Sequence, residues 1–156
     1  MLEFSEMSTE EHEHSVHLST IRVRYGETDA MGIAHHSSYL AWFEVGRVEF
    51  MRHLSHSYRA LEESGISFPV IDLRIKYKKP SYFDEILELQ TVCLKAAKTR
   101  TRFGYRLLRG TVTIALGYTE HATLGPKTKV IRTPEEFRKS LFPYIPAADQ
   151  MLDFHR

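Results

Sequence analysis

The chain has 156 residues, of which 42% are hydrophobic and 12% aromatic, which suits one domain with one core. Its 21 Lys and Arg against 20 Asp and Glu leave a net charge of +1, which argues against bulk attraction to nucleic acid or to a bilayer. The single cysteine, Cys93, excludes an intramolecular disulfide, and no long uncharged apolar run predicts a signal peptide or membrane span. We therefore expect a cytoplasmic protein without a nucleic-acid partner or membrane insertion.

Residues 1–17 differ in composition from the rest of the chain. They hold five glutamates and three histidines, and no Lys or Arg precedes Arg22. We interpret this segment as a mobile acidic tail. The His-Glu-His spacing of His12 and His14 invites a metal hypothesis, but alternating ligands in an unstructured segment lack preorganisation and a fourth ligand. We predict no metal site.

The first regular pattern begins near Thr20. Ile21, Val23 and Tyr25 alternate with arginines, which predicts a half-buried strand ending at Tyr25. A helix is expected to begin near Ser37 or Ser38 and to cover residues 39–54. Because this helix is apolar on most sides, we expect the rest of the fold to wrap it.

The remainder of the chain reads mainly as strands. Four stretches have the composition or the alternation of a strand: residues 71–78, 87–94, 103–107 and 112–118. Pro80 breaks the first of them, and Gly110 marks the turn between the last two. Short helices are predicted over residues 58–64, ending at Gly65, and after Pro134. The sum is an α+β fold in which about five antiparallel strands, linked mostly by hairpins, curl around one long helix.

The loop between the first strand and the long helix is the candidate site. It carries Glu27 and Asp29, a glycine at Gly32 that permits a positive φ, and His36 before the helix. Free amides at a helix N-terminus attract an anion, or a carbonyl oxygen that is becoming one. Taken alone, Asp29 is more often a turn or capping residue and His36 a polar residue at a helix start.

The order Tyr-x-x-Thr-Asp-x-x-Gly-x-x-x-His-x-x-Tyr-x-x-x-x-Glu-x-x-Arg runs from Tyr25 to Arg47. It resembles that of the hotdog-fold acyl-CoA thioesterases, in the 4-hydroxybenzoyl-CoA thioesterase and YbgC-like group, and weaker similarity extends over residues 20–140. The resemblance implies a hotdog fold, with Asp29 as the catalytic carboxylate and His36 beside the thioester. It also implies an active site at a subunit interface, in a homodimer or homotetramer.

We therefore predict an acyl-CoA thioesterase that releases the free acid and CoA, with CoA as part of the substrate and no bound cofactor. Asp29 and His36 are the predicted catalytic residues. The predicted substrate-binding residues are Gly32, Ile33, His35, Tyr39 and Glu44. For Glu44 the simpler interpretation is an ion pair with Arg47 one helical turn away.

The predicted catalytic domain covers residues 18–142, followed by a C-terminal extension over 143–156. Two other functions remain open: a hotdog hydratase or dehydratase, and a non-catalytic acyl-binding protein. Basic residues concentrate on the predicted strands, where they form a solvated face or hold CoA phosphates. They are Arg74, Lys76, Lys78, Lys79, Lys95, Lys98, Arg100, Arg102 and Arg106.

Overall fold

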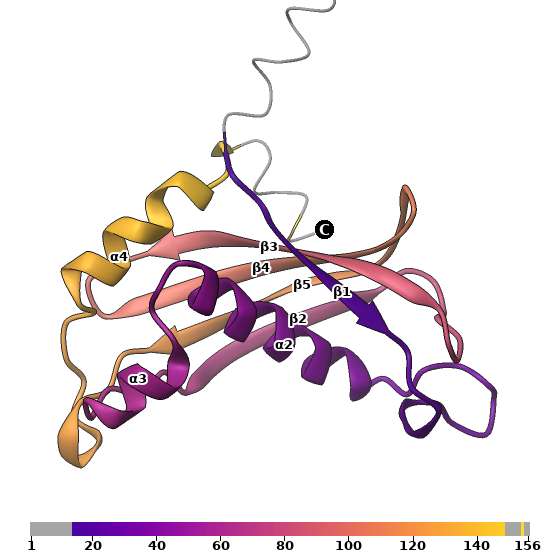
Figure 1. The fold of residues 1–156 in the computed structure, drawn as a ribbon, viewed down its shortest axis with the longest axis horizontal. Coiled ribbons are helices and arrows are strands. Elements are labelled where there is room, and N and C mark those ends of the chain that lie inside the picture. Colours follow the sequence, from indigo (N-terminus) through magenta and orange to yellow (C-terminus); the bar gives the residue numbers. More distant parts are fainter. Residues whose placement is uncertain (1–13, 149–153, 155–156) are drawn as a thin grey trace, which may run out of the picture.

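The computed structural model describes residues 14–148 and residue 154 (Figure 1). The α+β class is confirmed, and most of the predicted elements are present with boundaries shifted by a few residues. The elements are β1 (His17–Arg22), the 3-10 turn η1 (Tyr25–Glu27), α2 (Ser38–His53), α3 (Tyr58–Glu63), β2 (Val70–Tyr77), β3 (Ile86–Ala96), β4 (Arg100–Arg109), β5 (Val112–Ala122), the 3-10 turn η2 (Pro126–Thr128), α4 (Glu135–Leu141) and the 3-10 turn η3 (Phe142–Tyr144). Among these described helices, none combines the length and apolar composition that crossing a bilayer requires.

One antiparallel sheet holds all five strands, in the order β1-β3-β4-β5-β2. Hairpins join β3 to β4 and β4 to β5, as predicted around Gly110, whose φ is +58°. The other two pairings are not hairpins, because the chain places β1 beside β3 and carries β2 to the far edge beside β5. The prediction that hairpins link most strands is therefore wrong for β1 and β2.

Helix α2 crosses one face of this sheet (Figure 1) and supplies the centre of the core. Phe43 and Phe50 are fully buried, and the Phe43 ring stacks on Tyr105 with centroids 4.4 Å apart. Gly46 permits the close approach, since a Cβ there would lie 2.5 Å from a methyl carbon of Leu89 on β3. Each fully buried aromatic side chain contributes about 2–3 kcal/mol of hydrophobic free energy.

The other side of α2 is exposed. Leu40 and Val45 are 39% and 45% exposed, and Glu44 and Glu49 lie on the same side. The prediction that the fold wraps the helix on most sides holds for only one side in the single chain. The apolar residues on the open side explain why the sequence of α2 lacks a single narrow apolar stripe.

The first strand is shorter than predicted at its C-terminal end. The Arg24 amide donates to Glu27 Oε2 at 2.7 Å, and the Arg24 guanidinium lies 3.0 Å from Glu27 Oε1. These bonds close the chain into η1, so β1 ends at Arg22 and Tyr25 is 78% exposed. Partial burial raises the pKa of Glu27, but the bonds from Arg24 outweigh it and leave this pKa below its usual value.

The described residues nearest to the two ends of the chain contact the rest of the domain. Most of the predicted acidic tail, residues 1–13, lies outside the described residues. His17 belongs to β1 and its ring stacks on Phe50 at 5.4 Å, so the predicted boundary at residue 17 falls inside a strand. The Ser15 amide donates to the Pro143 carbonyl at 2.8 Å. Phe154 is buried against Val92 and Leu94, within the predicted C-terminal extension.

A chain of buried hydrogen bonds links α2 to the sheet. Arg47 Nη1 donates to the Tyr105 hydroxyl at 3.3 Å, and this hydroxyl lies 2.7 Å from Thr119 Oγ1. His121 Nε2 lies 2.8 Å from Thr119 Oγ1, and its Nδ1 lies 2.8 Å from the Phe68 carbonyl. A carbonyl only accepts, so the proton of neutral His121 sits on Nδ1 and Nε2 accepts from Thr119. Burial, followed by the charge of Arg47, lowers the pKa of His121 to about 4.

This network predicts acid sensitivity of the fold. In the unfolded chain His121 takes up a proton near its ordinary pKa of 6.5, whereas in the folded chain its pKa is about 4. The free energy of unfolding therefore falls as the pH drops from 6.5 to about 4, by roughly 3 kcal/mol from this residue. In His121→Asn we expect lower stability at pH 7.5 but a shallower loss over this range, measured by urea unfolding. If the free energy of unfolding falls equally steeply with pH in the variant and the wild type, His121 is not the source of the acid sensitivity.

Candidate active site

Asp29 lies in a small hairpin between η1 and α2. Thr28 and Ala34 pair as an antiparallel bridge, and the Asp29 amide donates to the Ile33 carbonyl at 2.9 Å. The Gly32 amide donates to the Asp29 carbonyl at 3.0 Å, which closes the turn. Gly32 has a φ of +78°, so the predicted need for a glycine at this position is confirmed.

One oxygen of the Asp29 carboxylate is fixed and the other is available. Oδ1 accepts from the Met31 amide at 2.8 Å, which orients the side chain over the turn. Within residues 14–148, no donor contacts Oδ2. A half-buried carboxylate held at one oxygen can take a proton from water, or attack a carbonyl carbon, with the other.

The hairpin is held in place from both sides. On one side the Ala34 amide donates to the Ser81 carbonyl at 2.8 Å. On the other side the Glu27 carbonyl accepts from the His35 amide at 2.7 Å and from Ser38 Oγ at 2.9 Å. Since Ser38 is the first residue of α2, these bonds fix the position of Asp29 relative to the helix N-terminus.

A cleft of about 490 Å³ opens beside this hairpin. It brings together Asp29, Ile33, His36 and Tyr39 from the predicted set. Six further residues complete the lining: Met31, Ala34, Tyr77, Lys78, Lys79 and Pro80. Of these, only Lys78 and Lys79 were among the cations considered for CoA phosphates. Across residues 14–148, no three His, Cys, Asp or Glu side chains come together as metal ligands would.

His36 lines the cleft and has a backbone donor that is unpaired within residues 14–148. Its amide has no acceptor among the described residues, while its carbonyl accepts from the Tyr77 hydroxyl at 2.9 Å. The His36 ring lies 4.1 Å from the ring of His35, between centroids. In the described part of the chain no hydrogen bond joins His36 to Asp29, so the two residues share the cleft without direct contact.

Two tyrosines line the helix side of the cleft. Tyr39 is 3% exposed, and its hydroxyl lies 2.8 Å from Ser81 Oγ. The Tyr77 ring meets Tyr39 edge-on, with centroids 5.0 Å apart. Partial burial, and then the neighbouring Tyr39, raise the pKa of Tyr77, so its hydroxyl stays protonated and donates to His36. Alternation in the sequence placed Tyr77 on a strand but gave no sign that this strand reaches the helix N-terminus.

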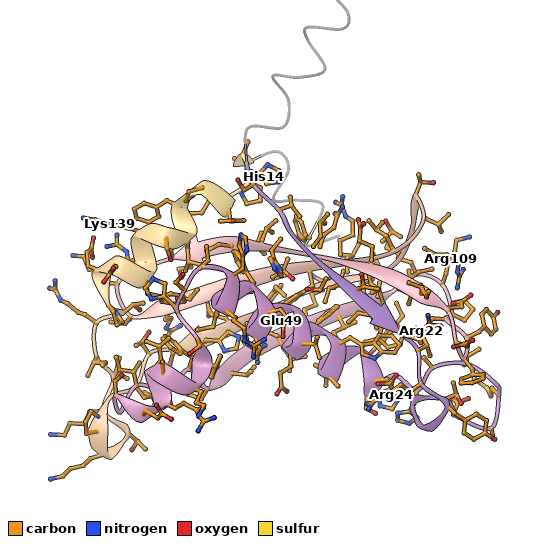
Figure 2. The ribbon with its side chains drawn as sticks, in the orientation of Figure 1. His14, Arg22, Arg24, Glu49, Arg109 and Lys139 are labelled. Carbon is orange, nitrogen blue, oxygen red and sulfur yellow. The ribbon has the colours of Figure 1, made fainter. Side chains whose placement is uncertain are left out.

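Three of the predicted substrate-binding residues do not line the cleft. Gly32 shapes the turn, and His35 is exposed with its Nδ1 2.7 Å from Ser37 Oγ. Glu44 lies on the open side of α2, at a separate hollow of about 350 Å³ that also includes Glu49. Figure 2 labels Glu49 on this helix. Among the described residues Glu44 makes no ion pair with Arg47, which turns inward instead.

An arginine that the sequence did not single out supports the wall of the cleft. Arg109 Nη2 donates to the Pro80 carbonyl and to Glu85 Oε2, each at 2.8 Å. The same carboxylate oxygen accepts from the Tyr82 amide at 3.0 Å. Arg109 ends β4 at the same end of the molecule as Arg22 (Figure 2). It therefore ties the β4–β5 hairpin to the segment that contacts the Asp29 hairpin.

Comparisons with known proteins place the chain in a family and support its fold. A family model described as the thioesterase-like superfamily matches residues 23–141. The chain belongs to this superfamily. It is 40% identical over 87 residues to the putative acyl-CoA thioesterase YneP of Bacillus subtilis, across 56% of this chain and 63% of YneP. This match therefore spans less than two thirds of YneP.

Two further members of the superfamily match over longer stretches. The acyl-CoA thioesterase YbgC of Haemophilus influenzae is 31% identical over 120 residues, which are 76% of this chain and 88% of YbgC. A crystal structure of DHNA-CoA thioesterase from Staphylococcus aureus superimposes with a TM-score of 0.76 at 30% identity, covering 80% of this chain and 87% of that one. These likenesses confirm the hotdog fold.

The turn at Gly32 gives a direct test of the site in this thioesterase-like protein. Alanine at a φ of +78° costs about 1 kcal/mol and shifts the hairpin that carries Asp29. In Gly32→Ala we expect kcat for thioester hydrolysis to fall at least about tenfold, because small displacements of reacting groups are costly. Steady-state rates and thermal unfolding measure the two effects.

The matched control is Gly65→Ala. Gly65 ends α3 with a φ of +86°, so alanine is strained there as well, and the nearest atom to its Cβ lies 3.5 Å away. This variant should lose similar stability and keep its kcat. Equal kcat values for the two variants would show that the Gly32 turn does not position the reacting groups.

Proposed function

We propose that this protein hydrolyses an acyl-CoA thioester to the free acid and CoA, with Asp29 as the essential carboxylate. The observation that carries the proposal is that Asp29 and His36 line the same cleft. Among the described residues, Asp29 has a free Oδ2 there, and the His36 amide has no acceptor. Membership of the thioesterase-like superfamily supports thioester hydrolysis as the reaction. The names of YneP and YbgC support CoA as the thiol part of the substrate.

Asp29 serves in one of two ways. As a general base it takes a proton from water while the water oxygen bonds to the thioester carbon. The tetrahedral intermediate then breaks its C–S bond, and the CoA thiolate leaves and takes up a proton. As a nucleophile, Asp29 bonds to that carbon, expels the thiolate and forms an anhydride that water hydrolyses. Neither route requires a cofactor.

The His36 amide is suited to stabilise the oxyanion in either route. A backbone N–H aimed at the developing negative charge contributes about 3–4 kcal/mol to lowering the barrier. The Tyr77 hydroxyl donates to the His36 carbonyl at 2.9 Å and so restrains the peptide bond between His36 and Ser37. His36 thus acts through its backbone, while its side chain borders the cleft.

The edge of the sheet favours a homodimer. Strand β2 ends the sheet, and Ile71 and Leu73 on its helix side are each 46% exposed. A long edge strand with apolar side chains is normally covered. Antiparallel pairing with a second β2 would cover it and bring Asp72, near one end of the strand, toward the basic end of its partner.

A cytoplasmic location fits a substrate drawn from the CoA pool.

Asp29→Asn tests the essential carboxylate. Removing the base or nucleophile should lower kcat by at least about a hundredfold without changing the unfolding temperature. A thiol-reactive dye detects the release of CoA from a panel of acyl-CoA substrates. The control is Asp84→Asn, which should retain full turnover. Asp84 is an exposed carboxylate on a neighbouring loop, where it pairs with Arg22 of β1. Turnover near that of the wild type in Asp29→Asn would refute the mechanism.

Leu73→Glu tests the homodimer. A charge on the helix side of β2 should convert the dimer to a monomer and reduce activity, as measured by light scattering and initial rates. Leu18→Glu is the control, because Leu18 is 56% exposed on the opposite edge strand β1. A wild-type protein that is monomeric at micromolar concentration would contradict the proposed assembly.

A further inference from the structure

A row of cations follows the outer face of β2. Arg74 and Lys76 lie opposite Tyr118 and Leu116 of β5, on the face of the sheet that points away from α2. Side chains two residues apart on a strand share a face, so these two cations form a row along the edge strand. All of β2 except Ile75 is exposed, and solvent reaches the row freely.

Lys78 extends the row past the end of the strand. Its amide donates to the Ile114 carbonyl at 2.8 Å, and the Lys79 amide donates to the same carbonyl at 3.1 Å. Both lysines also line the cleft beside Asp29. The row therefore begins at the mouth of the candidate active site and continues along β2 for about 13 Å, at the rise of an extended strand.

The charge of the row is unbalanced. Among the described residues, none of Arg74, Lys76 and Lys78 forms an ion pair with a carboxylate. By contrast, Arg102 on the same face lies 4.0 Å from Asp72 and 3.3 Å from Glu120. The charge of Lys78, foremost, and that of Arg74 lower the pKa of Lys76. Like charges held this close together favour a bound anion.

We infer that Arg74, Lys76 and Lys78 bind the phosphate groups of the CoA part of the substrate. The inference rests on the proposed function, since it takes the thioester to lie at Asp29. CoA carries phosphates at two separate places, a diphosphate and a 3′-phosphate, and a linear row of cations can contact both. Arginine and lysine are the side chains that form charge-assisted bonds to phosphate.

Dimerisation through β2 leaves this row positive. An antiparallel partner would bring one Asp72 toward each row, and Asp72 already contacts Arg102 and accepts from the Tyr118 hydroxyl. The row of each chain holds three cations, Arg74, Lys76 and Lys78, against this single carboxylate. Positive charge therefore remains available to an anionic ligand in the assembled protein.

The test compares an acyl-CoA with the N-acetylcysteamine thioester of the same acid, which has the reacting group but no phosphate. In Lys76→Gln/Lys78→Gln, we expect the ratio of KM for acyl-CoA to KM for the phosphate-free thioester to rise at least about tenfold. The KM of the wild type for acyl-CoA should increase with salt, and that of the variant should increase less. An unchanged ratio of KM values would overturn the inference.

Two controls separate this result from other causes. Lys129→Gln/Lys139→Gln removes the same charge from the loop before α4 and from α4 itself, where Figure 2 labels Lys139, and should leave the ratio unchanged. Light scattering should give Lys76→Gln/Lys78→Gln the same oligomeric state as the wild type. A shift to monomer would show that the row is an interface between copies, and so overturn the inference.

Calorimetry keeps the inference separate from the proposed activity. Free CoA should bind the wild type at least about tenfold more tightly than it binds Lys76→Gln/Lys78→Gln, while the affinity for pantetheine should be equal in both. If the wild type cleaves no thioester but this difference appears, the proposed function fails and the phosphate site stands. If thioesters are cleaved and the difference is absent, the phosphate site fails and the activity stands.

Discussion

The geometry of the candidate active site depends on the hydrogen bonds of one buried serine. Ser81 is fully buried, its carbonyl accepts from the Ala34 amide, and its hydroxyl lies 2.8 Å from that of Tyr39. These two bonds join the Asp29 hairpin, helix α2 and the segment between β2 and β3 at a single point. Buried polar groups are costly unless they are paired, so the three parts hold one arrangement.

Strand β2 serves three purposes at once. Its inner face brings Tyr77 to the cleft, its outer face carries the cations, and its free edge is open to a partner. The roles proposed for this strand account for its exposure in the single chain, although its sequence alternates like that of a half-buried strand. A stability argument alone would have favoured a shorter or more polar edge.

The sequence predicted the helices and strands better than it predicted which of them lie side by side in the fold. Periodicity located α2 and the strands, and the motif around Asp29 pointed to a cleft that also contains His36. Tyr77 and Arg109 could not be placed, because strand order and the approach of β2 to the helix N-terminus depend on contacts distant in sequence. Glu44, predicted as a substrate contact, lies outside the cleft that holds Asp29, and the sequence could not show this because composition cannot say which side of a helix meets the sheet.

The bond from Arg109 to the Pro80 carbonyl has a practical consequence for engineering. The tip of the β4–β5 hairpin is exposed, and such tips commonly accept insertions. Here the residue before the tip supports the wall of the cleft beside Asp29, so a fluorescent protein or affinity tag spliced between β4 and β5 would disturb the shape of that cleft. The turn around η2, at the opposite end of the molecule in Figure 1, is the better place to attach such a label.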